Sequence, residues 1–150
     1  MAFSSIEELI AFAVRQEENS SEFYRKAMQL APDKRSGQLL EELAGEELEH
    51  CRMLAGIGAD GSGLPPFSEP ADKLVSEYLS QIPLHDGMSF TEVMIHAIKK
   101  EENSCRFYRD LARTSLNPRL ADMLNRLAAI EQTHKVRLEE YFLIEVSSVI

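Results

Sequence analysis

The sequence predicts an all-α protein, a four-helix bundle made of two antiparallel helix hairpins joined by a long crossover. Two observations carry this prediction: one part of the sequence repeats another, and four long segments have apolar residues at helical spacing. The chain has 150 residues, which is enough for one domain with a buried core. We therefore expect a single domain over residues 1–150.

The repeat has an offset of 84 residues and appears in two separate segments. In the first segment the recurring residues are Glu17, Glu18, Asn19, Ser20, Phe23 and Tyr24, which return as Glu101, Glu102, Asn103, Ser104, Phe107 and Tyr108. The same offset carries Leu43, Ala44, Glu47, His50 and Leu54 onto Leu127, Ala128, Glu131, His134 and Leu138. Two segments that share one offset indicate a duplicated pair of helices, over about residues 6–56 and 90–144.

The first hairpin is delimited by capping and breaking residues. Ser4 with Glu7 three residues later reads as a capping box, which predicts that the first helix begins after Ser4. This helix is expected to end before Pro32. The second helix is predicted over about residues 34–54, because a glycine-rich stretch follows at residues 56–63.

The second hairpin carries similar signals. Its first helix is predicted to begin near Ser89, where Glu92 completes another capping box, and to continue to about Thr114. The last helix is predicted to begin at Asn117-Pro118, a cap followed by proline at the first helical position, and to continue to about Ile144. We expect four long helices in total.

The lengths of the connections predict the topology. The links around Pro32 and around Asn117 are short, so each half should be an antiparallel helix hairpin. The middle segment, about residues 57–88, is long and contains glycine and proline, with a possible short helix over residues 71–79. A long crossover between two hairpins is the ferritin-like version of the four-helix bundle.

Composition narrows the function classes. Asp and Glu number 25 against 16 Lys and Arg, a formal charge of -9, which disfavours nucleic-acid binding and suits cation binding. No apolar run is long enough to span a membrane, and the amino end lacks a secretory signal. The two cysteines, Cys51 and Cys105, form no Cys-x-x-Cys pair. We expect a cytoplasmic protein with reduced cysteines and no nucleic-acid or membrane partner.

Each predicted helix directs one glutamate toward the core, and two helices add a histidine. In the first and third helices the apolar stripe contains Glu17 and Glu101. In the second and fourth helices it contains two ligand residues one turn apart, Glu47 with His50 and Glu131 with His134, while Glu42, Glu46 and Glu49 lie beside the stripe.

Four buried carboxylates need compensation, because an isolated charge in an apolar interior costs many kcal/mol. The core-facing stripes contain no lysine or arginine near these positions to pair with them. Two divalent cations would neutralise four carboxylates, and carboxylate with imidazole suits Fe(II), Mn(II) or Zn(II). The sequence therefore predicts a two-metal site held by Glu17, Glu47, His50, Glu101, Glu131 and His134.

Other polar and aromatic residues receive separate interpretations. Tyr24 and Tyr108 follow Glu17 and Glu101 by seven residues, and we interpret them as partners whose hydroxyls orient ligating carboxylates, with plain core aromatics as the alternative. His85 and His96 are expected to be solvated. Cys105 is expected to be a small core residue rather than a redox thiol.

These residues resemble those of the rubrerythrins, a branch of the ferritin-like superfamily. The resemblance covers both hairpins and rests on Glu17 with Tyr24, Glu47 with His50, Glu101 with Tyr108, and Glu131 with His134. It implies that Glu47 and Glu131 bridge two metals, that Glu17 and His50 complete one coordination sphere, and that Glu101 and His134 complete the other.

The chain departs from the rubrerythrin pattern in two ways. The printed sequence has no rubredoxin part with paired Cys-x-x-Cys, which removes a built-in electron relay. Rubrerythrins also have a further glutamate three residues after the third-helix ligand, where this chain has Ser104. The remaining set of four glutamates and two histidines also resembles the ferroxidase centre of bacterioferritins.

The resemblance implies a non-haem di-iron oxidoreductase with two Fe ions per chain, Zn or Mn being possible substitutes. Its oxidant would be peroxide or dioxygen, and its electron donor would be an external rubredoxin-like protein. The resemblance also implies a role in oxidative stress and a homodimer. Two alternatives stay open: a ferroxidase unit that loads iron into a cage or partner shell, and a non-catalytic bundle stabilised by zinc.

Overall fold

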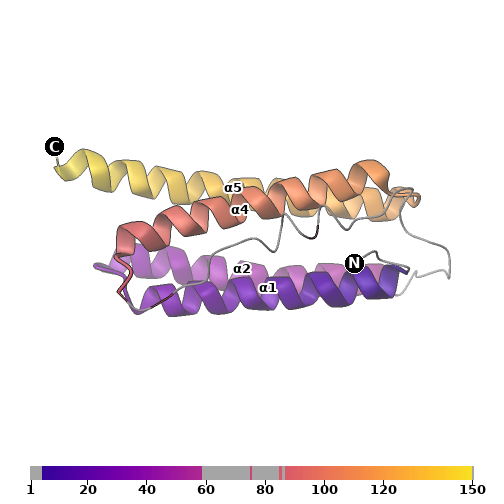
Figure 1. Ribbon diagram of the computed structural model, residues 1–150, viewed down its shortest axis with the longest axis horizontal. Helices are drawn as coiled ribbons and strands as arrows, with labels where there is room; N and C mark the ends of the chain where they lie inside the picture. The colour runs from indigo at the N-terminus through magenta and orange to yellow at the C-terminus, as the bar shows by residue number, and fades with distance from the viewer. Residues whose placement is uncertain (1–4, 59–74, 76–84, 86, 150) are drawn as a thin grey trace.

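A computed structural model describes residues 5–58, 75, 85 and 87–149. It contains four long helices, α1 (Ile6–Met28), α2 (Lys34–Gly58), α4 (Phe90–Thr114) and α5 (Pro118–Val149), and no β-strand within this part of the chain. Figure 1 shows them running along the long axis, with α1 and α2 paired in one layer and α4 and α5 in the other. The predicted all-α four-helix bundle of two helix hairpins is confirmed.

The helix starts follow the capping residues, with one correction. In α1 the N-cap is Ser5, whose Oγ accepts the Glu8 amide at 3.2 Å, so the predicted start at Ser4 was one residue early. Ser4-x-x-Glu7 and Ser5-x-x-Glu8 both match the capping pattern, and only contacts within the fold decide between them. In α4 the cap is Ser89, as predicted, and its Oγ accepts the Glu92 amide at 3.1 Å.

The other two helices begin as expected and end later. At α2 the Oδ1 of Asp33 accepts the Ser36 amide at 2.7 Å, and at α5 the Oδ1 of Asn117 accepts the Arg119 amide at 2.9 Å. However, α2 continues to Gly58 and α5 to Val149, past the predicted ends near residues 54 and 144. A glycine inside a helix costs only about 1 kcal/mol, so Gly56 does not stop α2.

The core consists of two apolar clusters at opposite ends of the bundle. The first apolar cluster includes Ile6, Leu9, Phe12, Leu54, Tyr108, Leu111, Leu124 and Leu127. The second apolar cluster includes Tyr24, Ala27, Leu40, Leu43, Met94, Ala97, Leu138 and Tyr141. On every helix the inward glutamate lies between the residues of the two clusters, so the acidic residues meet at mid-bundle with apolar packing above and below.

Most of the crossover lies outside the described residues, including most of the possible short helix over residues 71–79. Val75 is described there: it is helical and buried in the first apolar cluster. None of the described helices is apolar enough over a sufficient length to cross a membrane.

Candidate metal centre

The structure brings together all six residues predicted as metal ligands. One group comprises Glu17, Glu47, His50 and Glu131, and the second comprises Glu47, Glu101, Glu131 and His134. Within each group one ligand atom per residue lies within 4.8 Å of the others. All six side chains are buried, with at most 2% of the surface exposed.

The two groups have Glu47 and Glu131 in common, so the cluster has two adjacent positions that share two carboxylates. The first position adds Glu17 and His50, and the second adds Glu101 and His134. This is the division that the rubrerythrin resemblance implies. Whether these residues hold metal stays a prediction.

Both histidines direct Nδ1 into the cluster. The Nδ1 of His50 lies 3.1 Å from Oε2 of Glu17 and 3.0 Å from Oε1 of Glu131, with hydrogen-bond geometry toward Glu17. The Nδ1 of His134 lies 2.8 Å from Oε1 of Glu47. The two rings are nearly parallel, with centroids 5.7 Å apart and an interplanar angle of 8°. Each half of the repeat therefore supplies an equivalent imidazole nitrogen.

The two tyrosines link the hairpins through the outer carboxylates. Tyr24 on α1 donates its hydroxyl hydrogen to Oε1 of Glu101 on α4. Tyr108 on α4 donates to Oε1 of Glu17 on α1 at 2.6 Å. Burial, followed by the charge of Glu101, raises the pKa of Tyr24 well above its usual range, so its phenol stays protonated and keeps donating. Each tyrosine thus holds the glutamate of the opposite hairpin.

Protons and charges are divided unevenly among the four carboxylates. Burial, then the charges of Glu101 and Glu17, raise the pKa of Glu47 well above its usual range. Burial and the neighbouring glutamates do the same to Glu131. Burial and the like charges therefore favour the protonated form of the shared pair, at the positions where cations would otherwise compensate the charge.

The outer carboxylates stay ionised. Burial acts to raise the pKa of Glu17, but hydrogen bonds from His50 and Glu47 outweigh it and the net shift is downward. Burial opposes ionisation of Glu101 too, and hydrogen bonds from Glu131 and His134 again lower its pKa. The pKa of His134 is raised, because the hydrogen bond and charge of Glu101 outweigh burial.

Three buried polar atoms in the described part of the chain have no hydrogen-bond partner: Oε2 of Glu101, Oε1 of Glu131 and Nε2 of His134. An unsatisfied buried polar atom costs about 1–3 kcal/mol, so three of them in one cluster need an explanation. A cation at each position would satisfy the two carboxylate oxygens. The donors are oxygen and imidazole nitrogen without thiolate, a set that suits iron, manganese or zinc. The residues present therefore fit a two-metal centre.

The core-facing stripes contain no lysine or arginine near the ligands, but Lys100 lies next to one of them. Lys100, directly before Glu101 on α4, is half-buried, and its Nζ lies 5.8 Å from the centre of the Phe23 ring. Burial lowers the pKa of Lys100, while Glu101 and Glu47 oppose that shift. Lys100 lies outside the core-facing stripe, but a long side chain can reach back toward it. One lysine would compensate only part of the charge if all four carboxylates were ionised.

Sequence reasoning also missed Glu46, which was placed beside the stripe. Its Oε1 lies 3.5 Å from Nε2 of His134, and its Oε2 accepts Arg137 at 2.7 Å. The sequence contained one signal for this contact. Glu42 and Glu46 lie one turn apart on α2, and Arg137 lies one turn after His134 on α5.

The other singled-out residues lie outside the two groups. His85 is exposed and His96 is half-buried. Cys105 is buried in the first apolar cluster, with Sγ 3.7 Å from Oε1 of Gln132, and Cys51 is half-buried. Ser104 is buried, with 4% of its surface exposed.

Several solved structures share this architecture. A hypothetical protein from Pyrococcus furiosus matches with a TM-score of 0.69 and 20% identity over 95% of this chain and 91% of that one. A ferritin-like diiron-carboxylate protein from Thermotoga maritima matches with a TM-score of 0.66 and 18% identity, covering 93% and 95%. The dodecameric thioferritin of Bacteroides fragilis, described as bacterioferritin-related, matches with 0.65 and 16% identity, covering 96% and 89%.

No protein-family model matches the sequence, and no curated protein matches it either. The identities to the solved structures are all at or below 20%, so these matches establish the fold. The chain has the ferritin-like four-helix fold, and its mid-bundle carboxylate–histidine cluster is capable of holding metal.

Proposed function

We propose that this protein is a non-haem di-iron oxidoreductase of the rubrerythrin type, which reduces peroxide or dioxygen while Fe(II) is oxidised. The observation that carries the proposal is the pair of four-residue groups that share Glu47 and Glu131. Bound iron would supply the redox chemistry, and the protein would supply ligand geometry and an environment that excludes water.

The residues of the chain have distinct roles in this proposal. Glu47 and Glu131, which belong to both groups, would be the ligands common to the two metal positions. Glu17 with His50, and Glu101 with His134, complete the two positions. Tyr24 and Tyr108 keep the outer carboxylates aligned through their hydrogen bonds. The two apolar clusters shield the centre from bulk water at both ends.

The chemistry described for the neighbours supports iron as the metal. The Thermotoga maritima protein is described as a diiron-carboxylate protein and the Bacteroides fragilis protein as a thioferritin related to bacterioferritin. We propose two Fe ions per chain, with a rubredoxin-like protein as external electron donor. We also propose a cytoplasmic homodimer, with the exposed Leu143 and Ile144 near the end of α5 as candidate contact residues.

Ser104 favours a second candidate function. Rubrerythrins have a glutamate at this position, and here a buried serine leaves four glutamates and two histidines, the set that resembles a bacterioferritin ferroxidase centre. A ferroxidase unit would use the same centre to oxidise Fe(II) with dioxygen and release the product for storage.

The deciding experiment is anaerobic loading with Fe(II), metal analysis, and stopped-flow oxidation by peroxide and by dioxygen in parallel. Two irons per chain with faster oxidation by peroxide would support the oxidoreductase. Faster oxidation by dioxygen, with continued turnover of added Fe(II), would favour the ferroxidase. Zinc in the natively purified protein, with no redox change at the centre, would contradict both and leave a zinc-stabilised bundle.

A further inference from the structure

The imidazole of His134 has one nitrogen without a partner. Its Nδ1 faces Glu47, but its Nε2 is buried and makes no hydrogen bond. The neighbouring acceptor is Oε1 of Glu46 on α2, at 3.5 Å, which is at the outer limit of a hydrogen bond. Glu46 is about 40% exposed, so its carboxylate can shift toward the ring without displacing core side chains.

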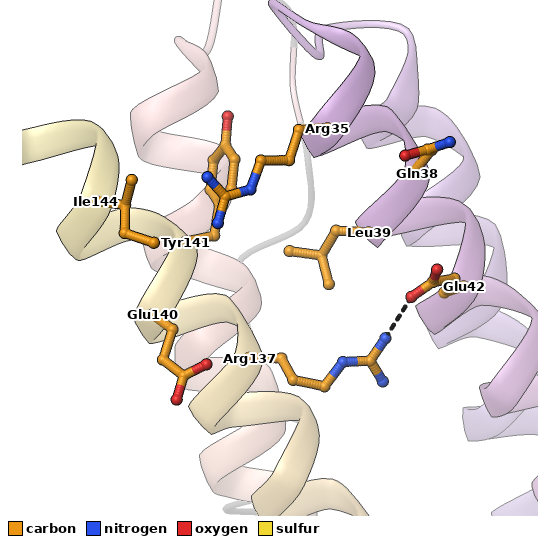
Figure 2. Close-up of a pocket in the computed structure, with 8 residues that line it drawn as sticks. All are labelled: Arg35, Gln38, Leu39, Glu42, Arg137, Glu140, Tyr141 and Ile144. Carbon is orange, nitrogen blue, oxygen red and sulfur yellow. Dashed lines mark hydrogen bonds and ion pairs between the residues drawn. The ribbon is translucent and has the colours of Figure 1, made fainter. Parts of the chain in front are cut away.

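Arg137 holds Glu46 in this place. Its Nη1 donates to Oε2 of Glu46 and its Nη2 donates to Oε2 of Glu42, both at 2.7 Å. Figure 2 shows Arg137 reaching from α5 toward Glu42 on α2. Both residues line a surface pocket with a volume of about 300 Å³. The guanidinium occupies one oxygen of Glu46 and leaves the other oxygen to face His134.

The repeat has no equivalent arrangement around His50. The offset of 84 residues carries Glu46 onto Ile130, and it carries Arg137 back onto Met53. Ile130 and Met53 are half-buried apolar residues, and Met53 packs against the first apolar cluster. His134 therefore has a carboxylate next to it, Glu46, which is held by Arg137. The equivalent positions in the other half of the repeat are apolar.

We propose that Glu46 is a positioning residue for His134, and that the two metal positions therefore bind with unequal affinity. The inference rests on the proposed two-metal centre. A metal bound at Nδ1 requires the ring proton to sit on Nε2. That buried N–H needs an acceptor, and Glu46 supplies it and fixes the ring orientation. In the other half of the repeat, the positions equivalent to Glu46 and Arg137 are Ile130 and Met53, which offer no carboxylate to His50.

The test uses Zn(II) titrations against a chromophoric chelator, with the wild-type protein and three variants. The wild type should bind two ions in two resolved steps. Glu46→Ala should weaken one step by about 10- to 100-fold and leave the other within about 3-fold. Glu46→Gln keeps an acceptor oxygen and should restore most of that loss. Ile130→Ala is the matched control in the other half and should leave both steps within about 3-fold of the wild type.

A spectroscopic readout separates positioning from a general structural effect. In Zn-loaded, ¹⁵N-labelled protein, His134 should show a protonated Nε2 with a downfield proton, and this signal should shift or vanish in Glu46→Ala. Thermal melts of the metal-free variants check that each one folds.

The outcomes distinguish the positioning role of Glu46 from the two-metal centre on which it rests. If the wild type binds two Zn(II) ions and Glu46→Ala weakens both steps equally, or neither step, the positioning role is overturned and the metal centre stands. If the folded wild type fails to bind two ions, the proposed function itself fails.

Discussion

Tyr108 on α4 donates a 2.6 Å hydrogen bond to the buried carboxylate of Glu17 on α1, joining the two hairpins through their acidic residues. The repeat produces the equivalent hydrogen bond in the other direction, from Tyr24 on α1 to Glu101 on α4. Because α1 and α4 each carry one tyrosine and one outer glutamate, each hairpin fixes the outer carboxylate of the other.

Replacing Tyr108 with phenylalanine should destabilise the metal-free protein. A hydrogen bond to a charged group contributes about 1.5–3 kcal/mol, and the Glu17 carboxylate would lose one donor in a buried place. Urea denaturation of Tyr108→Phe should show this loss in the free energy of unfolding. Tyr141→Phe is the control: its hydroxyl donates to Asp33 at 3.3 Å, so it should cost less than about 1 kcal/mol. Equal costs for both variants would contradict the assigned role of Tyr108.

The shared and outer ligands should differ in metal stoichiometry. Glu47→Ala or Glu131→Ala should disturb both ions, because each carboxylate belongs to both groups. His50→Ala or His134→Ala should weaken mainly one ion, because each histidine belongs to one group. Metal analysis after dialysis against a fixed Zn(II) concentration measures this. Complete and equal loss in all four variants would remove the support for bridging.

Much of the fold and the composition of the candidate site could be predicted from the sequence. One offset of 84 residues paired the halves, and the capping signals at Ser89 and Asn117 gave correct helix starts. Helix periodicity alone directed Glu47 and Glu131 inward, because residues one turn apart share a face.

Features that depend on the rotation of one helix against another could not be predicted in this way. The hydrogen bonds from Tyr24 and Tyr108 to the glutamates of the opposite hairpin are examples. Periodicity predicts which face of a helix a side chain lies on, but not which residue of another helix it contacts. Glu46 lies at the edge of its stripe, and only the approach of α5 to α2 brings His134 to it. Lys100 was missed because it lies outside the stripe, although its charge interacts with Glu101 and Glu47.

The stability of the metal-free protein should fall as pH rises above the usual glutamate range. The pKa values of Glu47 and Glu131 are raised above 4.5 in the folded state. Their contribution is therefore fully present below pH 4.5 and is lost as pH rises through the raised folded pKa values. Glu47→Gln mimics the protonated acid and should flatten this dependence in urea melts between pH 5 and 8. Glu41→Gln, on the exposed side of α2, is the control and should leave the slope unchanged.

Metal should reverse that pH dependence, because a cation takes the place of the protons. Binding at the cluster requires Glu47 and Glu131 to ionise, so uptake of Zn(II) or Fe(II) should release protons and become stronger with rising pH. The unfolded chain does not keep the six residues together, so metal should stabilise the folded state and raise its melting temperature in a concentration-dependent way. For one site at a metal concentration of 100 times the Kd, the gain in free energy of unfolding is about 2.7 kcal/mol.

The measurement is a pair of anaerobic thermal melts, with and without metal, at several pH values from 6 to 8, together with proton release in weakly buffered solution. The gap between the two melting temperatures should widen as pH rises. Melting curves that coincide at every pH, with no protons released, would show that the buried carboxylates are compensated without metal.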